Sequence, residues 1–241
     1  RTIGVDSVRD LFADIPPSIC HTCLPLAGQG MTEIEADARL AEMAGGNRRF
    51  ASFAGAGSYV HHVPPVVDQL ALRSEFYTAY TPYQAEISQG TLTAIFEFQT
   101  MICRLTGMDV TNASMYDGAT ALAEAVLMAC RARGLDRFAV SEGVNGAYLE
   151  VLRTYAWASS LEMQVVPVRE GITDAGWFEG RAGNEFAACV FQSPNRYGLI
   201  EDARMLSAAA HEKGAYSIQT ATEALSLALL ARPGDCGVDI F

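Results

Sequence analysis

The sequence predicts an α/β fold, and three observations carry the prediction. Short runs rich in β-branched and aromatic residues alternate with longer segments whose apolar residues recur at helical spacing. The intervals between the runs are long enough for the crossover helix that parallel strands require. Half of the 241 residues are hydrophobic and only 19% are charged, so the chain can bury a core.

The predicted elements follow one another from about residue 86 onward. One helical face is formed by apolar residues spaced three or four apart, namely Ile95, Phe98, Ile102 and Leu105, and Gly107 provides the stop. A second helix is predicted from about Gly118 to Arg133 and is closed by Gly134. Strands are then predicted at 138–140, 163–168, 187–191 and 216–218, with helices around 147–156 and 202–213 between them.

The first part of the chain is less regular. A short helix is predicted after Ser7, ending before Pro16, and a second helix opens with the capping box of Thr32 and Glu35 and ends at Gly45. We expect residues 1–65 to form an arm with short helices and residues 66–241 to form part of a larger α/β domain. Since residues 237–241 read as a buried strand, we also expect the natural chain to continue beyond them.

Charge and composition exclude several classes of protein. The formal net charge of −11 disfavours binding to nucleic acid or to anionic membranes, because both need clustered basic residues. No run approaches the roughly 18 apolar residues that span a bilayer, and no signal peptide opens the chain, so a cytoplasmic protein is expected. The only lysine, Lys213, lies at the end of a predicted helix before Gly214, which predicts a solvated surface residue, as for His211 beside it.

Three further motifs have competing interpretations. Cys20 and Cys23 lack the additional ligands of a zinc site and the strand and helix of a redox pair, so no metal site is predicted. The glycine-containing segment 53–59 is either a ligand-facing loop or a plain surface connection. Asp117 precedes a helix whose start could hold a phosphate, but its carboxylate would occupy the same donors, which favours a structural cap.

Residues 77–90 form the densest polar and aromatic stretch, with three tyrosines and two threonines around a proline. These hydroxyls and rings favour a binding or interface loop over local structural hydrogen bonding. Together with stretches 3–12, 112–121 and 194–202, this block resembles glycine decarboxylase, the P-protein of the glycine cleavage system, and in particular subunit 1 of its two-subunit form. Cys20, Cys23 and Ala224 depart from the family's usual pattern.

The resemblance implies part of the large domain of the type I pyridoxal-phosphate-dependent transferase fold, with an N-terminal helical arm. It implies a cytoplasmic heterotetramer in which subunit 2 carries the cofactor lysine. The reaction implied is decarboxylation of glycine, with transfer of the aminomethyl group to the lipoyl group of H-protein. A lysine amine in a desolvated pocket is needed to hold the cofactor covalently, and Lys213 does not match that requirement. We therefore expect this chain to bind no cofactor covalently.

The resemblance also implies which residues line the cleft or bind substrate, without assigning individual roles or any catalytic residue. They are Thr81, Tyr83, Gln84, Glu86, His62, Asn112, Ser114 and Asn195. The loop 194–198, which holds Asn195, is also compatible with an ordinary turn. Two other functions stay open on the sequence: the N-terminal half of a single-chain P-protein, and a catalytically silent scaffold paralogue.

Overall fold

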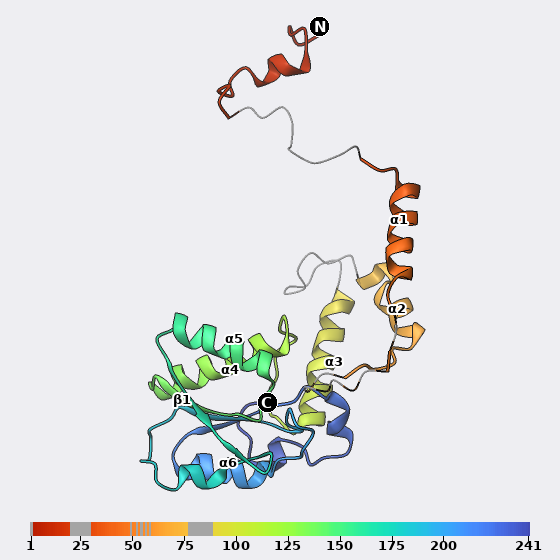
Figure 1. Cartoon of the computed structure of the whole chain (residues 1–241). Helices are drawn as coiled ribbons and strands as arrows, with labels where there is room; N and C mark the ends of the chain where they lie inside the picture. The colour runs from red at the N-terminus through yellow and green to blue at the C-terminus, as the bar shows by residue number, and fades with distance from the viewer. Residues whose placement is uncertain are drawn as a thin grey trace. The chain divides into compact units, whose positions relative to one another are not determined.

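The computed structural model describes residues 2–19, 30–48, 50, 51, 53, 55, 57, 59–76 and 89–241. The chain divides into two units, Arg1–Ala51 and Ser52–Phe241. Figure 1 shows the helices and strands of the whole chain, coloured by residue number. The predicted division at residue 65 stays a prediction about domain organisation. The units observed here place Gly57 and His61 in the same unit as the sheet.

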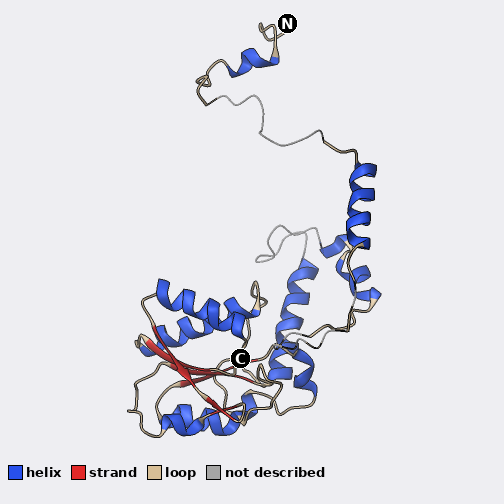
Figure 2. Ribbon diagram, viewed as in Figure 1, coloured by secondary structure: helices blue, strands red, loops and turns tan. Residues whose placement is uncertain are grey.

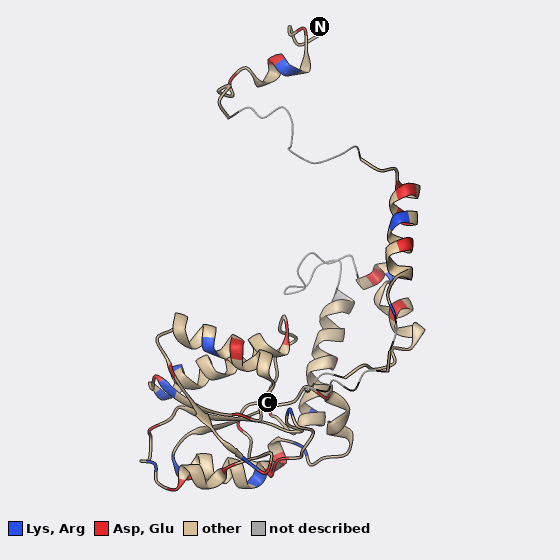
Figure 3. Cartoon of the chain, in the orientation of Figure 1, with Lys and Arg blue, Asp and Glu red and all other residues tan. Residues whose placement is uncertain are grey.

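The first unit holds helix α1 (Glu33–Gly45), which begins as predicted at Thr32. The Thr32 hydroxyl accepts from the Glu35 backbone N–H at 3.3 Å, and the Glu35 carboxylate accepts from the Thr32 N–H at 2.8 Å. None of the described residues of this unit is buried. Figure 3 shows charges of both signs along α1, as expected for a helix surrounded by solvent.

A short helix follows Ser7 and ends before Pro16, as predicted. The structure has a 3₁₀ helix, η1 (Val8–Phe12), whose side chains are exposed. Pro16 disfavours helical dihedrals at the residue before it, and so short a stretch does not repay the cost of starting an α-helix.

The second unit is built on a four-stranded parallel sheet, which confirms the predicted α/β class. Its strands are β1 (Arg137–Ser141), β2 (Glu162–Val166), β5 (Ala188–Gln192) and β6 (Tyr216–Thr220), in the order β2-β1-β5-β6. Every pair is parallel. The central strands β1 and β5 are almost wholly buried, as the apolar runs in the sequence predicted.

Helices cover both faces of the sheet (Figure 2). Helices α4 (Gly118–Arg133) and α5 (Gly146–Ala158) lie on one face, and α6 (Ala203–Glu212) lies on the other. Alternate strand residues serve the two layers, so Val140 packs with α4 and α5 whereas Ala139 packs on the α6 side. This layered packing is the main core of the molecule.

Helices α2 (Pro65–Ala71) and α3 (Gln89–Thr106) come before α4 in the chain. Helix α3 ends as predicted before Gly107, whose φ is 76°, and α4 ends before Gly134, whose φ is 64°. Figure 3 shows that α3 is nearly free of charge, and two of its apolar side chains, Phe96 and Met101, are exposed.

The segment predicted as one strand at 163–168 is two elements, because Pro167 has no N–H to continue the ladder. After it, β3 (Val168–Arg169) pairs antiparallel with β4 (Ile172–Thr173). The final segment follows 3₁₀ helices η4 (Ala224–Ala228) and η5 (Gly234–Cys236), and joins the sheet by a single parallel bridge between Ile218 and Ile240.

Gly234 provides a test of how the end of α3 is held against η5. A Cβ at Gly234 would overlap the carbonyl of Gly107, and a backbone group cannot rotate away. We expect Gly234→Ala to lower the free energy of unfolding by about 1–3 kcal/mol, measured by urea denaturation. Gly183→Ala is the matched control, since a Cβ there meets open space. Equal midpoints for the two variants would contradict the packing described.

Candidate functional site

The strand order places a topological switch point between β1 and β5, because the chain leaves β1 toward β2 on one side and reaches β5 on the other. Doubly wound sheets bind their ligands outside the carboxyl ends of the strands at this point. We call the residues that end β1, β5 and β6, together with the loops that follow them, the carboxyl edge.

Gln192, the last residue of β5, connects three loops of the carboxyl edge. Its side chain is fully buried. The amide oxygen accepts from the backbone N–H of Asn145 at 2.8 Å, and the amide nitrogen donates to the Pro194 carbonyl at 2.9 Å and to the Thr222 hydroxyl at 3.4 Å. One side chain therefore links the loops after β1, β5 and β6.

Glu201 is the second buried polar residue of the edge, with an exposed fraction of 4%. Its carboxylate accepts from the Thr173 hydroxyl at 2.9 Å, from the Thr173 N–H at 3.1 Å and from the Asn195 amide at 2.8 Å. All of these donors are neutral. The carboxylate is held by hydrogen bonds in the way that buried charges require.

The hydrogen bonds to Glu201 determine which group donates and which accepts in a chain of two hydroxyl groups beneath the carboxyl edge. The Ser141 and Thr173 hydroxyl oxygens lie 2.7 Å apart, and the Gly143 N–H donates to Ser141 at 2.9 Å. Because Thr173 donates its only hydroxyl proton to Glu201, Ser141 must donate to Thr173. The chain from Gly143 through both hydroxyls thus ends on the Glu201 carboxylate.

Asn195, a predicted cleft residue, is 1% exposed and organises a turn. Its amide nitrogen donates to the Gly171 carbonyl at 2.7 Å as well as to Glu201, and its oxygen accepts from the N–H groups of Tyr197 and Leu199. Two donor and two acceptor positions are therefore used. The geometry supports the ordinary-turn interpretation of this loop, and a role in substrate binding stays a prediction.

Asp117 caps α4, as predicted. Its carboxylate accepts from the Thr120 N–H at 2.9 Å, and this hydrogen bond lowers the pKa of Asp117. The N–H groups that could receive a phosphate at this helix start therefore face a carboxylate.

Lys213 is less solvated than predicted. It is half-buried, and its ammonium group donates to the Arg181 carbonyl at 2.9 Å and to the Glu179 carbonyl at 3.5 Å. Lys213 follows α6, which runs back from the carboxyl ends of the strands, so it lies at the opposite edge of the sheet. The sequence could not show this, because the two carbonyls lie more than 30 positions earlier.

His211 is exposed, as predicted, but it is also paired. Its Nε2 lies 2.8 Å from a carboxylate oxygen of Asp239, and the same oxygen accepts from the Ser217 N–H at 2.7 Å. This pair ties the end of α6 to the last segment of the chain.

Three other predicted residues, His62, Asn112 and Ser114, are described and exposed. The segment near Asn112 is held to α3 by the Gln99 amide, which donates to the Thr111 carbonyl at 2.7 Å. Outside the described residues lie Thr81, Tyr83, Gln84 and Glu86, as do Cys20 and Cys23.

Sequence reasoning missed the residues that build the edge: Asn145, Gln192, Glu201 and Thr222. A signal for one of them existed, since Gln192 directly follows a buried apolar run, where carboxyl-edge residues of parallel sheets are found. No comparable pattern marks Glu201, whose partner Thr173 is 28 positions away.

Metal and thiol chemistry find little support in the described part of the chain. It contains no cluster of three or more His, Cys, Asp or Glu that could hold a metal ion. Burial raises the pKa of the Cys189 thiol to about 12, so this thiol stays protonated and unreactive. Among the described helices, none is both long enough and apolar enough to cross a membrane.

Replacing Glu201 tests the buried network. In Glu201→Gln one carboxylate oxygen becomes an NH₂ group that faces donors, so we expect the free energy of unfolding to fall by about 1–3 kcal/mol. Glu212→Gln, at an exposed carboxylate at the end of α6, is the control and should change little. Urea denaturation of both variants measures the difference, and an equally stable Glu201→Gln protein would argue against the network.

Comparison with known proteins gives one consistent result. The family described as glycine cleavage system P-protein matches residues 1–241. Probable glycine dehydrogenase (decarboxylating) subunit 1 of Desulfitobacterium hafniense is 48% identical over 99% of this chain and 54% of its own length. The corresponding protein of Moorella thermoacetica is 47% identical over 98% and 53%. The chain thus spans about half the length of these relatives.

Solved structures agree with this result. A crystal structure of glycine decarboxylase (P-protein) in inhibitor-bound form is 44% identical and superposes with a TM-score of 0.88, covering 99% of this chain and 53% of that one. A NifS-like protein, at 11% identity and a TM-score of 0.52, shows the fold alone. The predicted class, the large domain of the type I pyridoxal-phosphate-dependent fold, is confirmed. The chain belongs to the glycine cleavage system P-protein family.

Proposed function

We propose that this chain acts as subunit 1 of glycine dehydrogenase (decarboxylating) in the cytoplasm. With the lysine-bearing subunit 2, as a heterotetramer, it would remove CO₂ from glycine and pass the aminomethyl group to the lipoyl group of H-protein. The names of the relatives support this proposal, since two share 47–48% of their residues with the chain and are called subunit 1.

The residues present here do not fit pyridoxal phosphate as a group held covalently by this chain. Lys213 is its only lysine, and the ammonium group is bonded to two carbonyls at the edge of the sheet opposite the switch point. The Asp117 carboxylate occupies the helix start where a phosphate could otherwise bind. The engagement of Lys213 is the observation that carries the proposal, because it leaves the cofactor to the partner subunit.

This chain would then contribute shape and polar groups to a shared cleft. Thr81, Tyr83, Gln84 and Glu86 remain the proposed substrate-facing residues, with His62, Asn112 and Ser114 beside them. Their hydroxyl, amide and carboxylate groups suit orientation of the glycine carboxylate or of the lipoyl dithiol, which requires hydrogen bonds at fixed positions. The carboxyl edge of the chain would brace the cleft.

Location of the cofactor tests the proposal directly. The purified chain is incubated with pyridoxal phosphate, with and without subunit 2, reduced with borohydride and mapped by mass spectrometry. We expect the adduct on the partner alone, because the Lys213 ammonium is engaged. An adduct on Lys213 in the folded protein would overturn the assignment of the cofactor to subunit 2.

Activity of the complex distinguishes a cleft-forming subunit from a silent scaffold. We expect Tyr83→Ala and Glu86→Ala each to reduce release of CO₂ from glycine by about tenfold to hundredfold, because misplacing substrate groups costs that much. Size-exclusion chromatography checks that the variants still assemble, and Glu212→Gln serves as the control. Full activity in correctly assembled variants would favour the scaffold.

A further inference from the structure

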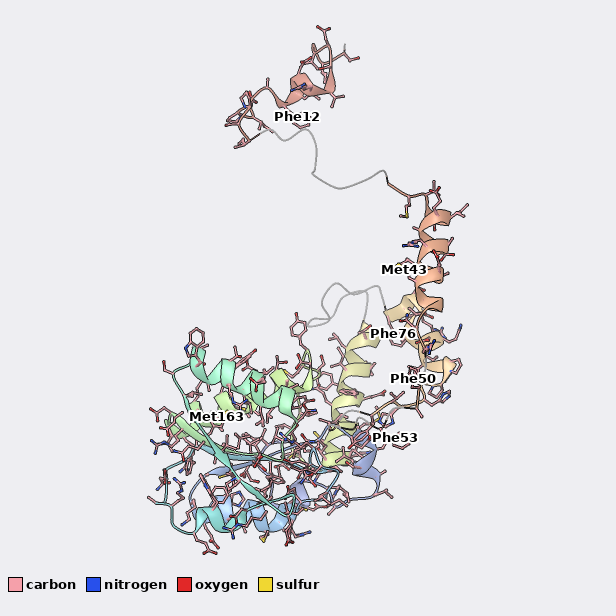
Figure 4. All side chains as sticks on the ribbon, viewed as in Figure 1. Phe12, Met43, Phe50, Phe53, Phe76 and Met163 are labelled. Carbon is pink, nitrogen blue, oxygen red and sulfur yellow. The ribbon has the colours of Figure 1, made fainter. Side chains whose placement is uncertain are left out.

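The segment before α2 enters the protein interior at one described point. Gly57 is buried, whereas Phe53, Tyr59 and Val60 around it are exposed, with Phe53 at 96% and Val60 at 99%. The side chain of Phe53 is labelled in Figure 4. The φ of Gly57 is 80°, a conformation that strains residues with a Cβ. The glycine therefore lets the backbone go where a larger residue would not fit without strain.

Gly57 lies against the carboxyl edge at the switch point. A Cβ placed on it would be 3.5 Å from each of three polar atoms, the amide nitrogens of Asn145 and Gln192 and the hydroxyl of Thr222. Asn145 and Thr222 belong to the loops after β1 and β6, and Gln192, at the end of β5, joins these loops. The backbone of Gly57 thus occupies the position where sheets of this topology receive a ligand.

A second contact holds the same segment four residues later. His61 Nε2 lies 3.0 Å from a carboxylate oxygen of Glu223, and the other oxygen of Glu223 accepts from the Leu225 N–H at 3.1 Å, at the start of η4. Glu223 directly follows Thr222, so both contacts attach to the loop after β6. Two adjacent residues of that loop therefore fix the segment at two points.

We propose that Gly57 and His61 act as a built-in covering segment, in which the Gly57 backbone lies where the switch-point crevice of this chain would otherwise receive a ligand. The crevice then takes no phosphorylated ligand, and the polar groups beneath Gly57 serve to hold the segment. Gly57 is the residue that enters the interior. The pair of His61 and Glu223, which we call the latch, holds the segment to the loop after β6. The proposal of a covering segment rests on contacts within this chain, and it goes beyond the proposed function.

Hydrogen exchange of the purified protein, followed by mass spectrometry, tests the latch. We expect the amide of Gly57 to be protected, because this residue is buried, and Glu223→Ala to speed its exchange about tenfold. Glu223→Gln should largely restore protection, because its amide oxygen still accepts from His61, and Glu212→Gln should match the parent protein. Exchange that is equally fast in all four proteins would overturn the proposal.

Two further measurements test occupancy of the crevice. Thr222→Val, which removes the hydroxyl beneath Gly57, should speed exchange at Gly57, while Gly183→Ala in open space should leave it unchanged. Pyridoxal phosphate and inorganic phosphate, added separately to the parent protein, should not alter exchange at Gly57. A change with either ligand would show that the crevice accepts it and would contradict the proposal. Loss of glycine decarboxylation in the complex would not, since these measurements need neither subunit 2 nor glycine.

Discussion

The buried amide of Gln192 is the interaction on which the carboxyl edge depends. Loops that follow different strands of a sheet are connected only through the strands themselves, so their relative positions need additional contacts. Gln192 supplies them by accepting from Asn145 and donating to the loops after β5 and β6. Because an unpaired buried amide is costly, the three loops hold one another in a single arrangement.

Glu201 connects loops on the other side of the carboxyl edge, through a carboxylate instead of an amide. It joins the β3–β4 hairpin, through Thr173, to the turn of Asn195, and the hydroxyl chain extends the contact to Ser141 at the end of β1. A carboxylate is well suited here because it only accepts hydrogen bonds, which fixes the direction of each hydroxyl. The edge is therefore held by buried hydrogen bonds on both sides of the switch point, and Gly57 lies against it.

Local patterns predicted the fold well, and contacts between distant residues explain what they missed. The ends of α3 and α4 followed from Gly107 and Gly134, and the central strands followed from apolar runs, because these signals lie within a few residues. The hairpin after Pro167 and the engagement of Lys213 depend on partners elsewhere in the chain. Glu201 was missed for the same reason, since it meets Thr173 across 28 positions.

The two edges of the sheet bear on the proposal that this chain leaves the cofactor to a partner subunit. At the edge opposite the carboxyl edge, the only lysine, Lys213, is bonded to backbone carbonyls. This engages the amine that a covalent cofactor would need. The Asp117 carboxylate caps the start of α4, and Gly57 covers the switch point at the carboxyl edge. At both of these described positions a group of the chain itself lies where a phosphorylated ligand could bind. The described surface includes exposed apolar side chains on α3, which are available to a partner. The chain would then contribute to the chemistry by associating with that partner.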